Sequence, residues 1–227
     1  MKTELKNKLA AEFESANFFE KIPAEVDDFK LRKVFSDDDD KFYYFTYENF
    51  LTHRSLTAYF HTETNEYKVR VKIGLTEFCL TNFFASGIEH FGKILDAELV
   101  SALKNLDTPL DADSDIFIAE QNFSTWEYGN NLPKNLEGFE LFIEPKNPVR
   151  ITNGSYIIIN YSDFDKNYEL NIIYNVYSDT FSGESQIGGV NHPLYIFDAK
   201  NLKQLEKILL QNLSKELQNI KQEVSRE

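Results

Sequence analysis

The sequence predicts an α+β fold of mostly antiparallel strands with an N-terminal, a middle and a long C-terminal helix. Aromatic residues make up 15% of the 227 residues, with 20 Phe and 12 Tyr, and these residue types favour the half-buried surface of a pleated sheet. Short strand-like runs follow one another between turn residues. The C-terminal segment instead carries leucines at helical spacing.

A fragment of the sequence nearly occurs twice, at an offset of 102 residues (189 − 87). Residues 87–97 and 189–199 share five positions: Gly87/Gly189, His90/His192, Ile94/Ile196, Asp96/Asp198 and Ala97/Ala199. A strand-like hairpin precedes each copy and an amphipathic helix follows it, which predicts two related units in tandem, residues 1–109 and 110–227. A chance match, or one continuous sheet sharing a single core, is the alternative.

The first unit is predicted to begin with a helix and continue with strands. Leu5, Leu9 and Phe13 have helical spacing over residues 3–16, and Pro23 closes this segment. Strands are expected over residues 29–35, 41–49, 56–62, 67–75 and 77–84, the last of which places Cys79 in the sheet. The acidic run Asp37–Asp40 is expected to form a loop.

The middle helix is predicted across residues 96–106, with a possible start at residue 87. Apolar residues at 88, 91, 95, 99, 103 and 106 keep helical spacing, and Ser86 with Glu89 has the form of a capping box. Residues 107–113 contain Pro109 and three Asp and are expected to form a linker.

The second unit is predicted to hold a hairpin, a mobile loop and the C-terminal helix. Strands are expected over 116–119 and 139–143, a hairpin over 156–161 and 168–177, and a further strand at 194–197, with Asp198 capping the next helix. The Gly/Ser-rich residues 182–190 are expected to be a mobile loop. Apolar residues step by three or four from Leu202 to Val224, so this helix is predicted to pack on a sheet; a coiled-coil dimer is the alternative.

The net charge of −13 limits the classes of partner. A field of this sign repels nucleic acids and anionic membranes and suits a basic protein partner through electrostatic steering, although it also serves solubility alone. The single cysteine fits a reducing compartment. With no secretory signal and no long apolar run, the sequence predicts a cytoplasmic protein.

Motifs that carry chemistry are weak in this sequence. Four His and one Cys do not offer zinc-ligand spacing, although a pseudo-two-fold axis would bring His90 and His192 together. Residues 111–115 and 163–167 begin like calcium loops but lack the Gly and Glu that complete one, and a linker and a hairpin turn are the preferred interpretations. No nucleophile elbow or phosphate loop is present, so no cofactor is predicted.

Five residues are predicted to bind a partner. Trp126 and Tyr128 lie in a turn-rich stretch, where exposed aromatic side chains serve as anchors; a small core beneath a long loop is the alternative. Asp38 and Asp39 belong to the acidic run that would meet a basic surface. His192 follows the 182–191 loop.

The sequence therefore predicts a non-enzymatic cytoplasmic protein that binds another protein, as an adaptor, a chaperone or an inhibitor of a basic partner. One alternative is a hydrolase that uses His192 as a general base, with nearby acids, beside a mobile 182–191 loop. Another is a small-molecule-binding domain with a pocket lined by Phe and Tyr.

Overall fold

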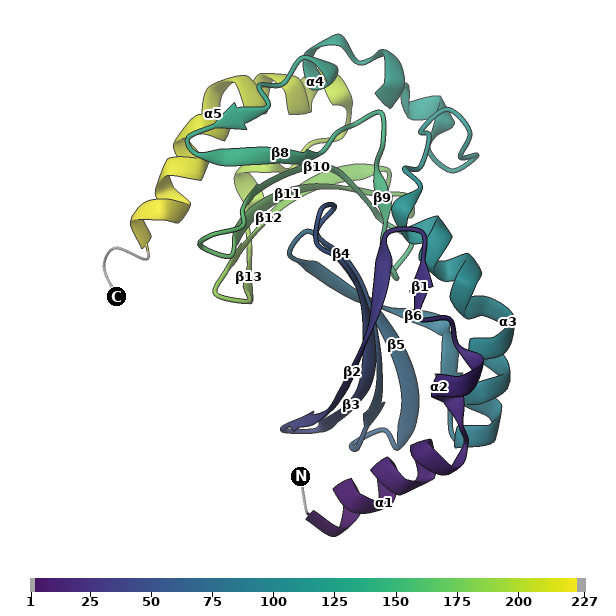
Figure 1. Cartoon of the computed structure of the whole chain (residues 1–227). Coiled ribbons are helices and arrows are strands. Elements are labelled where there is room, and N and C mark those ends of the chain that lie inside the picture. Colours follow the sequence, from purple (N-terminus) through teal and green to yellow (C-terminus); the bar gives the residue numbers. More distant parts are fainter. Residues whose placement is uncertain (1–2, 224–227) are drawn as a thin grey trace. The chain divides into compact units, whose positions relative to one another are not determined.

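The computed structural model describes residues 3–223. The chain divides into two compact units, Met1–Thr108 and Pro109–Glu227. Each unit contains one antiparallel sheet with a long helix on one face (Figure 1). The predicted α+β class, with N-terminal, middle and long C-terminal helices, is confirmed.

Unit 1 contains a six-stranded meander in which each strand pairs with the next. Its strands are β1 (Glu25–Val26), β2 (Phe29–Asp38), β3 (Lys41–Asn49), β4 (Arg54–His61), β5 (Glu66–Ile73) and β6 (Thr76–Ala85). Its helices are α1 (Thr3–Ser15), α2 (Phe18–Lys21) and α3 (Ile88–Asp107). The predicted 29–35 strand and the acidic loop are partly corrected, because β2 extends through Asp37 and Asp38.

The core of unit 1 forms where α1 and α3 bury their apolar stripes on one face of the sheet. Phe91, Leu95, Leu99 and Leu103 of α3 are all almost completely buried. On α1, the ring of Phe13 stacks on that of Tyr44 at a centroid distance of 4.2 Å. Large aromatic side chains therefore supply much of the apolar area that holds this unit together.

Unit 2 has a seven-stranded antiparallel sheet in the order β13-β12-β11-β10-β8-β7, with β9 paired to β10. Its strands are β7 (Asn135–Leu136), β8 (Phe139–Ile143), β9 (Val149–Arg150), β10 (Tyr156–Asp163), β11 (Tyr168–Asn175), β12 (Thr180–Ile187) and β13 (Val190–Pro193). Its helical elements are η1 (Ala119–Gln121), η2 (Phe123–Thr125), α4 (Glu127–Asn130), η3 (Tyr195–Phe197) and α5 (Leu202–Glu223).

Helix α5 packs on the sheet of unit 2, as predicted. Leu205, Leu209, Leu213, Leu217 and Ile220 are all buried in one cluster with residues of β8, β10, β11 and β12. The apolar stripe of α5 is therefore covered within its own unit rather than by a coiled-coil partner. The predicted stripe position Val224 lies outside the described residues.

A buried polar cluster occupies the other face of this sheet, on β10 and β11. Asn160 Nδ2 donates to Glu169 Oε2 at 2.9 Å and to Asn171 Oδ1 at 2.7 Å. Asn160 Oδ1 accepts a hydrogen bond from the Ser162 hydroxyl at 2.7 Å. All four residues are buried, and Leu170 and Ile172, which alternate with Glu169 and Asn171, belong to the core under α5.

The last three strands and the long helix follow one another in the same order in the two units, although unit 2 adds β9 and η3. The first residues of β4, β5, β6 and α3 each lie 114 residues before those of β11, β12, β13 and α5 (168 − 54, for example). Identical residues at this offset include Gly74/Gly188, Phe83/Phe197, Ala85/Ala199, Leu95/Leu209, Leu99/Leu213 and Leu103/Leu217. The buried leucines of the two long helices therefore occupy equivalent positions.

Individual contacts are also repeated in the two units. The Tyr47 hydroxyl donates to the carbonyl oxygen of Pro23, and the Tyr161 hydroxyl donates to that of Pro133. Left-handed backbone recurs at equivalent turns, with φ of 55° at Asn65 and 51° at Asp179. The tyrosines of these contacts lie 114 residues apart, as do Asn65 and Asp179, whereas Pro23 and Pro133 lie 110 residues apart (133 − 23). The first two strands follow this shorter offset as well, because β1 and β2 begin 110 residues before β7 and β8.

The predicted offset of 102 residues is wrong. His90 lies in α3, whereas His192 lies in the strand β13, so the two fragments are not structurally equivalent. Their similarity comes from short matches in elements of different type. The identities at the 114-residue offset are spread over turns, strands and the long helices rather than concentrated in one fragment.

Several local predictions are also corrected. Residues 116–119 form a turn that leads into η1, residues 182–190 form most of a β12–β13 hairpin rather than a mobile loop, and residues 194–197 contain η3 rather than a strand. The N-cap of α3 is Gly87, which makes no side-chain cap. Asn201, not Asp198, caps α5, because its Oδ1 accepts the Gln204 N–H at 3.0 Å.

Candidate functional site

The predicted binding residues Asp38 and Asp39 lie where β2 turns into β3. Asp38 is the last residue of β2, and Asp39 adopts a left-handed φ of 34° in the turn. Both side chains are exposed, whereas the next residue, Asp40, is half-buried. The acidic run therefore points its carboxylates in different directions, and only Asp40 joins a cluster of metal-ligating side chains.

Trp126 and Tyr128 lie within the packing around α4 of unit 2. The Trp126 side chain is buried, and its indole N–H donates to Glu206 Oε2 on α5 at 3.0 Å. Tyr128 is half-buried, and the centre of its ring lies 5.9 Å from that of the Trp126 ring. Burial raises the pKa of the Tyr128 hydroxyl. This placement matches the core alternative, and binding by these two residues stays a prediction.

Gly129 makes this packing possible and gives a testable prediction. A Cβ at position 129 would lie 2.2 Å from Trp126 Cε3, so we expect Gly129→Ala to lower the free energy of unfolding by about 1–3 kcal/mol. Urea unfolding followed by the fluorescence of Trp126, the only tryptophan, measures this. Glu127→Ala is the control, because the Glu127 side chain is exposed on the same helix, α4 of unit 2. Equal stability of wild type and Gly129→Ala would contradict the packing described.

His192 lies on the edge strand β13, with its side chain exposed. Its strand partner is Ser185, and the hairpin turns at Gly188 and Gly189, both with positive φ. The lid on which the hydrolase hypothesis depended is thus a regular hairpin. A catalytic role for His192 stays a prediction without that support.

The two calcium-like segments are turns in the structure. Asp111 Oδ1 accepts the backbone N–H of Asp113 at 3.0 Å, and Asp163 Oδ1 accepts that of Lys166 at 3.1 Å. Residues 163–167 connect β10 to β11, as predicted. The acidic side chains of both segments therefore perform ordinary turn chemistry.

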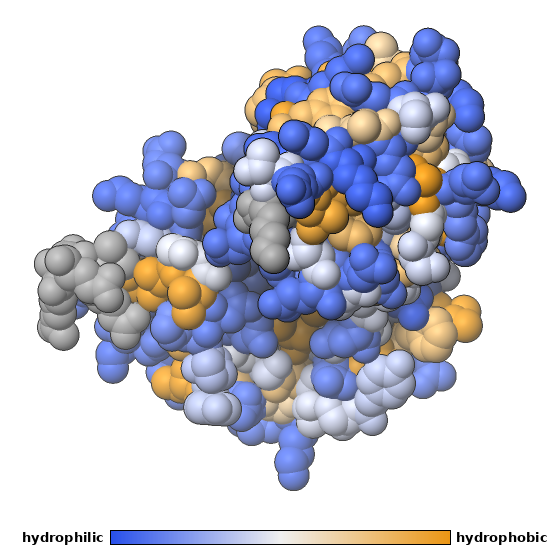
Figure 2. All heavy atoms as spheres, turned by 90° about the horizontal axis from the view of Figure 1, so that it is seen from below, coloured by the Kyte–Doolittle hydropathy of each residue, from blue (hydrophilic) through white to orange (hydrophobic). Residues whose placement is uncertain are grey.

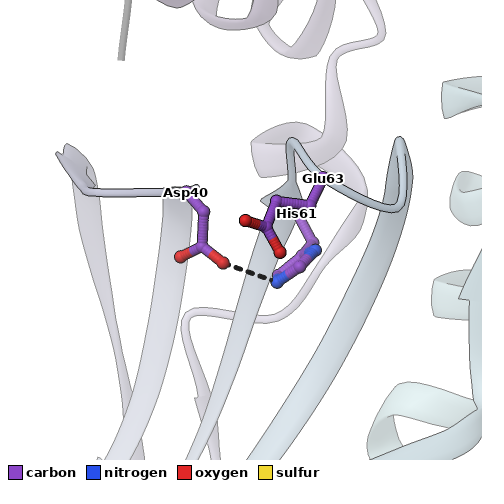
Figure 3. A group of neighbouring side chains, drawn as sticks. All are labelled: Asp40, His61 and Glu63. Carbon is purple, nitrogen blue, oxygen red and sulfur yellow. Dashed lines mark ion pairs between the residues drawn. The ribbon is translucent and has the colours of Figure 1, made fainter.

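Asp40, His61 and Glu63 form a cluster that the sequence did not predict (Figure 3). Each offers one ligand atom, and these atoms all lie within 4.8 Å of one another. His61 ends β4 and pairs with Lys41 at the start of β3, so the adjacent turns bring residues 40 and 63 to the same place. Figure 3 shows the three side chains converging from these two turns.

The imidazole of His61 is held through both ring nitrogens. Its Nε2 lies 2.8 Å from Asp40 Oδ2, and its Nδ1 accepts the backbone N–H of Thr64 at 3.3 Å. Because Nδ1 is the acceptor in this arrangement, the proton of the neutral ring lies on Nε2, directed at Asp40. The ring is therefore fixed in orientation by the turn that follows β4.

Lys41 bonds to one member of this cluster, and Lys68 bonds to Glu66 three residues after Glu63. The Lys41 ammonium lies 3.0 Å from Asp40 Oδ1, and this hydrogen bond is the main reason that the pKa of Asp40 lies below its ordinary value. Lys68, with help from Thr64, likewise lowers the pKa of the neighbouring Glu66. Both carboxylates therefore stay ionised at neutral pH, and the stability that Asp40 contributes is lost only as the pH falls through its lowered folded-state pKa.

Cys79 lies in β6, in the sheet as predicted. Its side chain is half-buried rather than fully buried, and its Sγ lies 3.2 Å from the Tyr59 hydroxyl on β4. Burial is the main cause of the raised pKa of Tyr59. The Tyr59 hydroxyl therefore gives the thiol a neutral hydrogen-bond partner.

Hydrophobic and hydrophilic residues are intermixed on the face drawn in Figure 2, where the hydrophobic ones occur in small groups. Among residues 3–223, no helix combines the length and the apolar character needed to cross a membrane. Comparison with protein-family models, with curated proteins and with solved structures gives no match for this chain.

Proposed function

We propose that this chain is a non-enzymatic cytoplasmic protein that binds a basic protein partner through the loop at the start of unit 2. The observation that carries this proposal is a pair of exposed apolar side chains with acidic residues on both sides in the sequence. Ile116 and Phe117 are 84% and 50% exposed, and exposed Asp111, Asp113 and Glu120 flank them in sequence.

The loop is anchored on both sides of the exposed pair. Ala112 and Ile118 are 1% and 0% exposed and belong to the core of unit 2. The backbone N–H of Ile118 donates to Asp115 O at 3.1 Å, and Asp115 Oδ2 accepts the Tyr156 hydroxyl at 3.0 Å. Because the loop is already ordered, binding through Ile116 loses less conformational entropy than binding through a flexible segment.

Charge supports the choice of a basic partner. The net charge is −13, and exposed acidic residues lie on both sides of Ile116 in the sequence, which suits an interface with an apolar centre and a polar rim. One cation lies at the pair, because the Arg150 guanidinium is 5.0 Å from the centre of the Phe117 ring. A positively charged partner surface would be attracted to this loop before contact. Nucleic acids and anionic membranes would be repelled by the same charge.

Capture of the partner at two salt concentrations tests the proposal. We expect the wild-type chain to retain a basic protein at low salt, with less retained as salt screens the rim charges. Ile116→Ser is expected to reduce retention by about tenfold or more, since loss of a central apolar anchor typically costs about 1–2 kcal/mol or more. Leu210→Ser is the matched control, because Leu210 is 65% exposed on α5, outside the loop.

Retention that Ile116→Ser leaves unchanged would contradict the proposed surface. Retention of an acidic protein, or retention that salt does not affect, would contradict the proposed chemistry of the partner. The hydrolase and the small-molecule-binding domain stay predictions from the sequence.

A further inference from the structure

We propose that Asp40, His61 and Glu63 bind one Zn²⁺ ion, with His61 Nε2, Asp40 Oδ2 and one oxygen of Glu63 as its protein ligands and water in the remaining position. This inference concerns unit 1 alone and does not rest on the proposed function. It starts from the cluster shown in Figure 3.

The ligand types select the class of metal. One imidazole and two carboxylates form a mixed nitrogen and oxygen set, which suits zinc and neighbouring first-row metals. Magnesium and calcium take oxygen ligands and use imidazole poorly. The two carboxylates also balance the charge of a divalent cation, while the imidazole binds as a neutral ligand.

The distances require only a small adjustment. In a tetrahedral site with bonds of about 2.0–2.2 Å, ligand atoms lie about 3.4 Å apart. His61 Nε2 and Asp40 Oδ2 are 2.8 Å apart with a proton between them, so replacing the proton by the metal must separate them slightly. The Glu63 side chain is exposed, so it can move toward the other two ligands without disturbing the core.

The contacts of the ligands are compatible with metal binding. Lys41 bonds to Asp40 Oδ1, which leaves Oδ2 for the metal. When Nε2 binds the metal, the ring proton moves to Nδ1, where the Thr64 hydroxyl at 3.2 Å can accept it. This new hydrogen bond replaces the one that Nδ1 now accepts from the Thr64 backbone N–H, which metal binding breaks. A hydrogen bond of this kind orients a metal-bound imidazole and tunes its basicity.

The equivalent turn of unit 2 shows what histidine adds. Asn175 occupies the position of His61 (175 − 61 = 114), and its Oδ1 accepts the backbone N–H groups of Tyr177 and Ser178 at 3.0 and 3.2 Å. An asparagine therefore caps this turn without an imidazole. His61 caps its turn through Nδ1 and has a second ring nitrogen, Nε2, which faces Asp40.

The His61→Asn variant separates metal binding from turn capping. Calorimetric titration with Zn²⁺ is expected to give saturable 1:1 binding to the wild type and binding weaker by at least about tenfold to His61→Asn. Without metal, His61→Asn is expected to unfold within about 5 °C of the wild type, because asparagine can cap the turn and only the partly exposed contact with Asp40 is lost. His90→Gln is the control, since His90 is exposed on α3 outside the cluster.

Two further measurements complete the test. Co²⁺ in place of Zn²⁺ is expected to give visible absorption bands that are lost in both His61→Asn and Glu63→Gln, the latter a change at an exposed side chain that leaves the fold intact. Mg²⁺ is expected not to compete. Absence of saturable Zn²⁺ binding, binding unchanged in His61→Asn, or equal competition by Mg²⁺ would each overturn the proposal.

Discussion

Replacing Leu209 by Ala is expected to lower the free energy of unfolding of unit 2 by about 2–5 kcal/mol. The Leu209 side chain is 2% exposed and lies in the cluster between α5 and the sheet, so its truncation removes buried apolar surface and leaves a cavity. Urea unfolding followed by Trp126 fluorescence is suited to this measurement, because the Trp126 indole bonds to Glu206 on the same helix.

The neighbouring residue gives a matched control. Leu210 is 65% exposed, so Leu210→Ala makes the same chemical change in the same helix without a cavity and is expected to alter stability by less than about 0.5 kcal/mol. Equal losses from the two variants would contradict the orientation of α5 described above.

Replacing Asn160 by Asp is expected to destabilise unit 2 at neutral pH by about 3 kcal/mol or more. The substitution keeps the shape of the side chain but turns the donor that now bonds Glu169 and Asn171 into a carboxylate oxygen. Two buried carboxylates at this distance cannot both ionise readily, so one of the pair retains a proton.

The pH dependence of this variant follows from that proton. The pKa of the introduced carboxyl in the folded state is raised above its unfolded value of about 3.9, so the folded state binds a proton that the unfolded state releases. The loss in free energy of unfolding relative to wild type should therefore grow as the pH rises from about 4 to 7 and shrink as the pH falls. Urea unfolding of Asn160→Asp and wild type across this range measures it.

Asn191→Asp is the control for charge alone. Asn191 is exposed on β13, and its Oδ1 accepts from Gln186 Nε2, a contact that aspartate keeps. A deficit for Asn160→Asp that is the same at pH 4 and pH 7 would contradict the like-charge explanation.

The sequence predicted the elements whose pattern is local. Alternating apolar residues located the strands of unit 1, and the leucine spacing located α5, because both patterns are set by one face of one element. The Gly and Ser content of residues 182–190 predicts a loop, and this prediction is wrong because these residues belong mostly to β12 and β13. In the structure, position 183 has no room for a side chain because the ring of Phe197 lies against it. A Cβ there would be 2.7 Å from Phe197 Cδ2.

The candidate metal site could not be predicted from spacing. Asp40 and His61 are separated by a whole hairpin, and only the β3–β4 register, with Lys41 opposite His61, brings them together. The acidic run predicts Asp38 and Asp39 as binding residues, yet of this run only Asp40 belongs to the described cluster, and Asp39 adopts a left-handed φ in the turn before it. Composition does not show which aspartate of the run lies beside His61. That depends on the backbone geometry of the β2–β3 turn and on the β3–β4 register.

The repeat also creates a risk of mispairing during folding, since α3 and α5 present leucines in the same register to similar sheets. One pair of equivalent positions distinguishes them: Gly92 of α3 lies against the Phe18 ring, whereas Glu206 of α5 accepts the Trp126 indole N–H. Exchange of the helices would set a carboxylate against Phe18 and leave the indole N–H without its acceptor. Each helix is thereby matched to its own sheet by a contact that penalises the wrong partner.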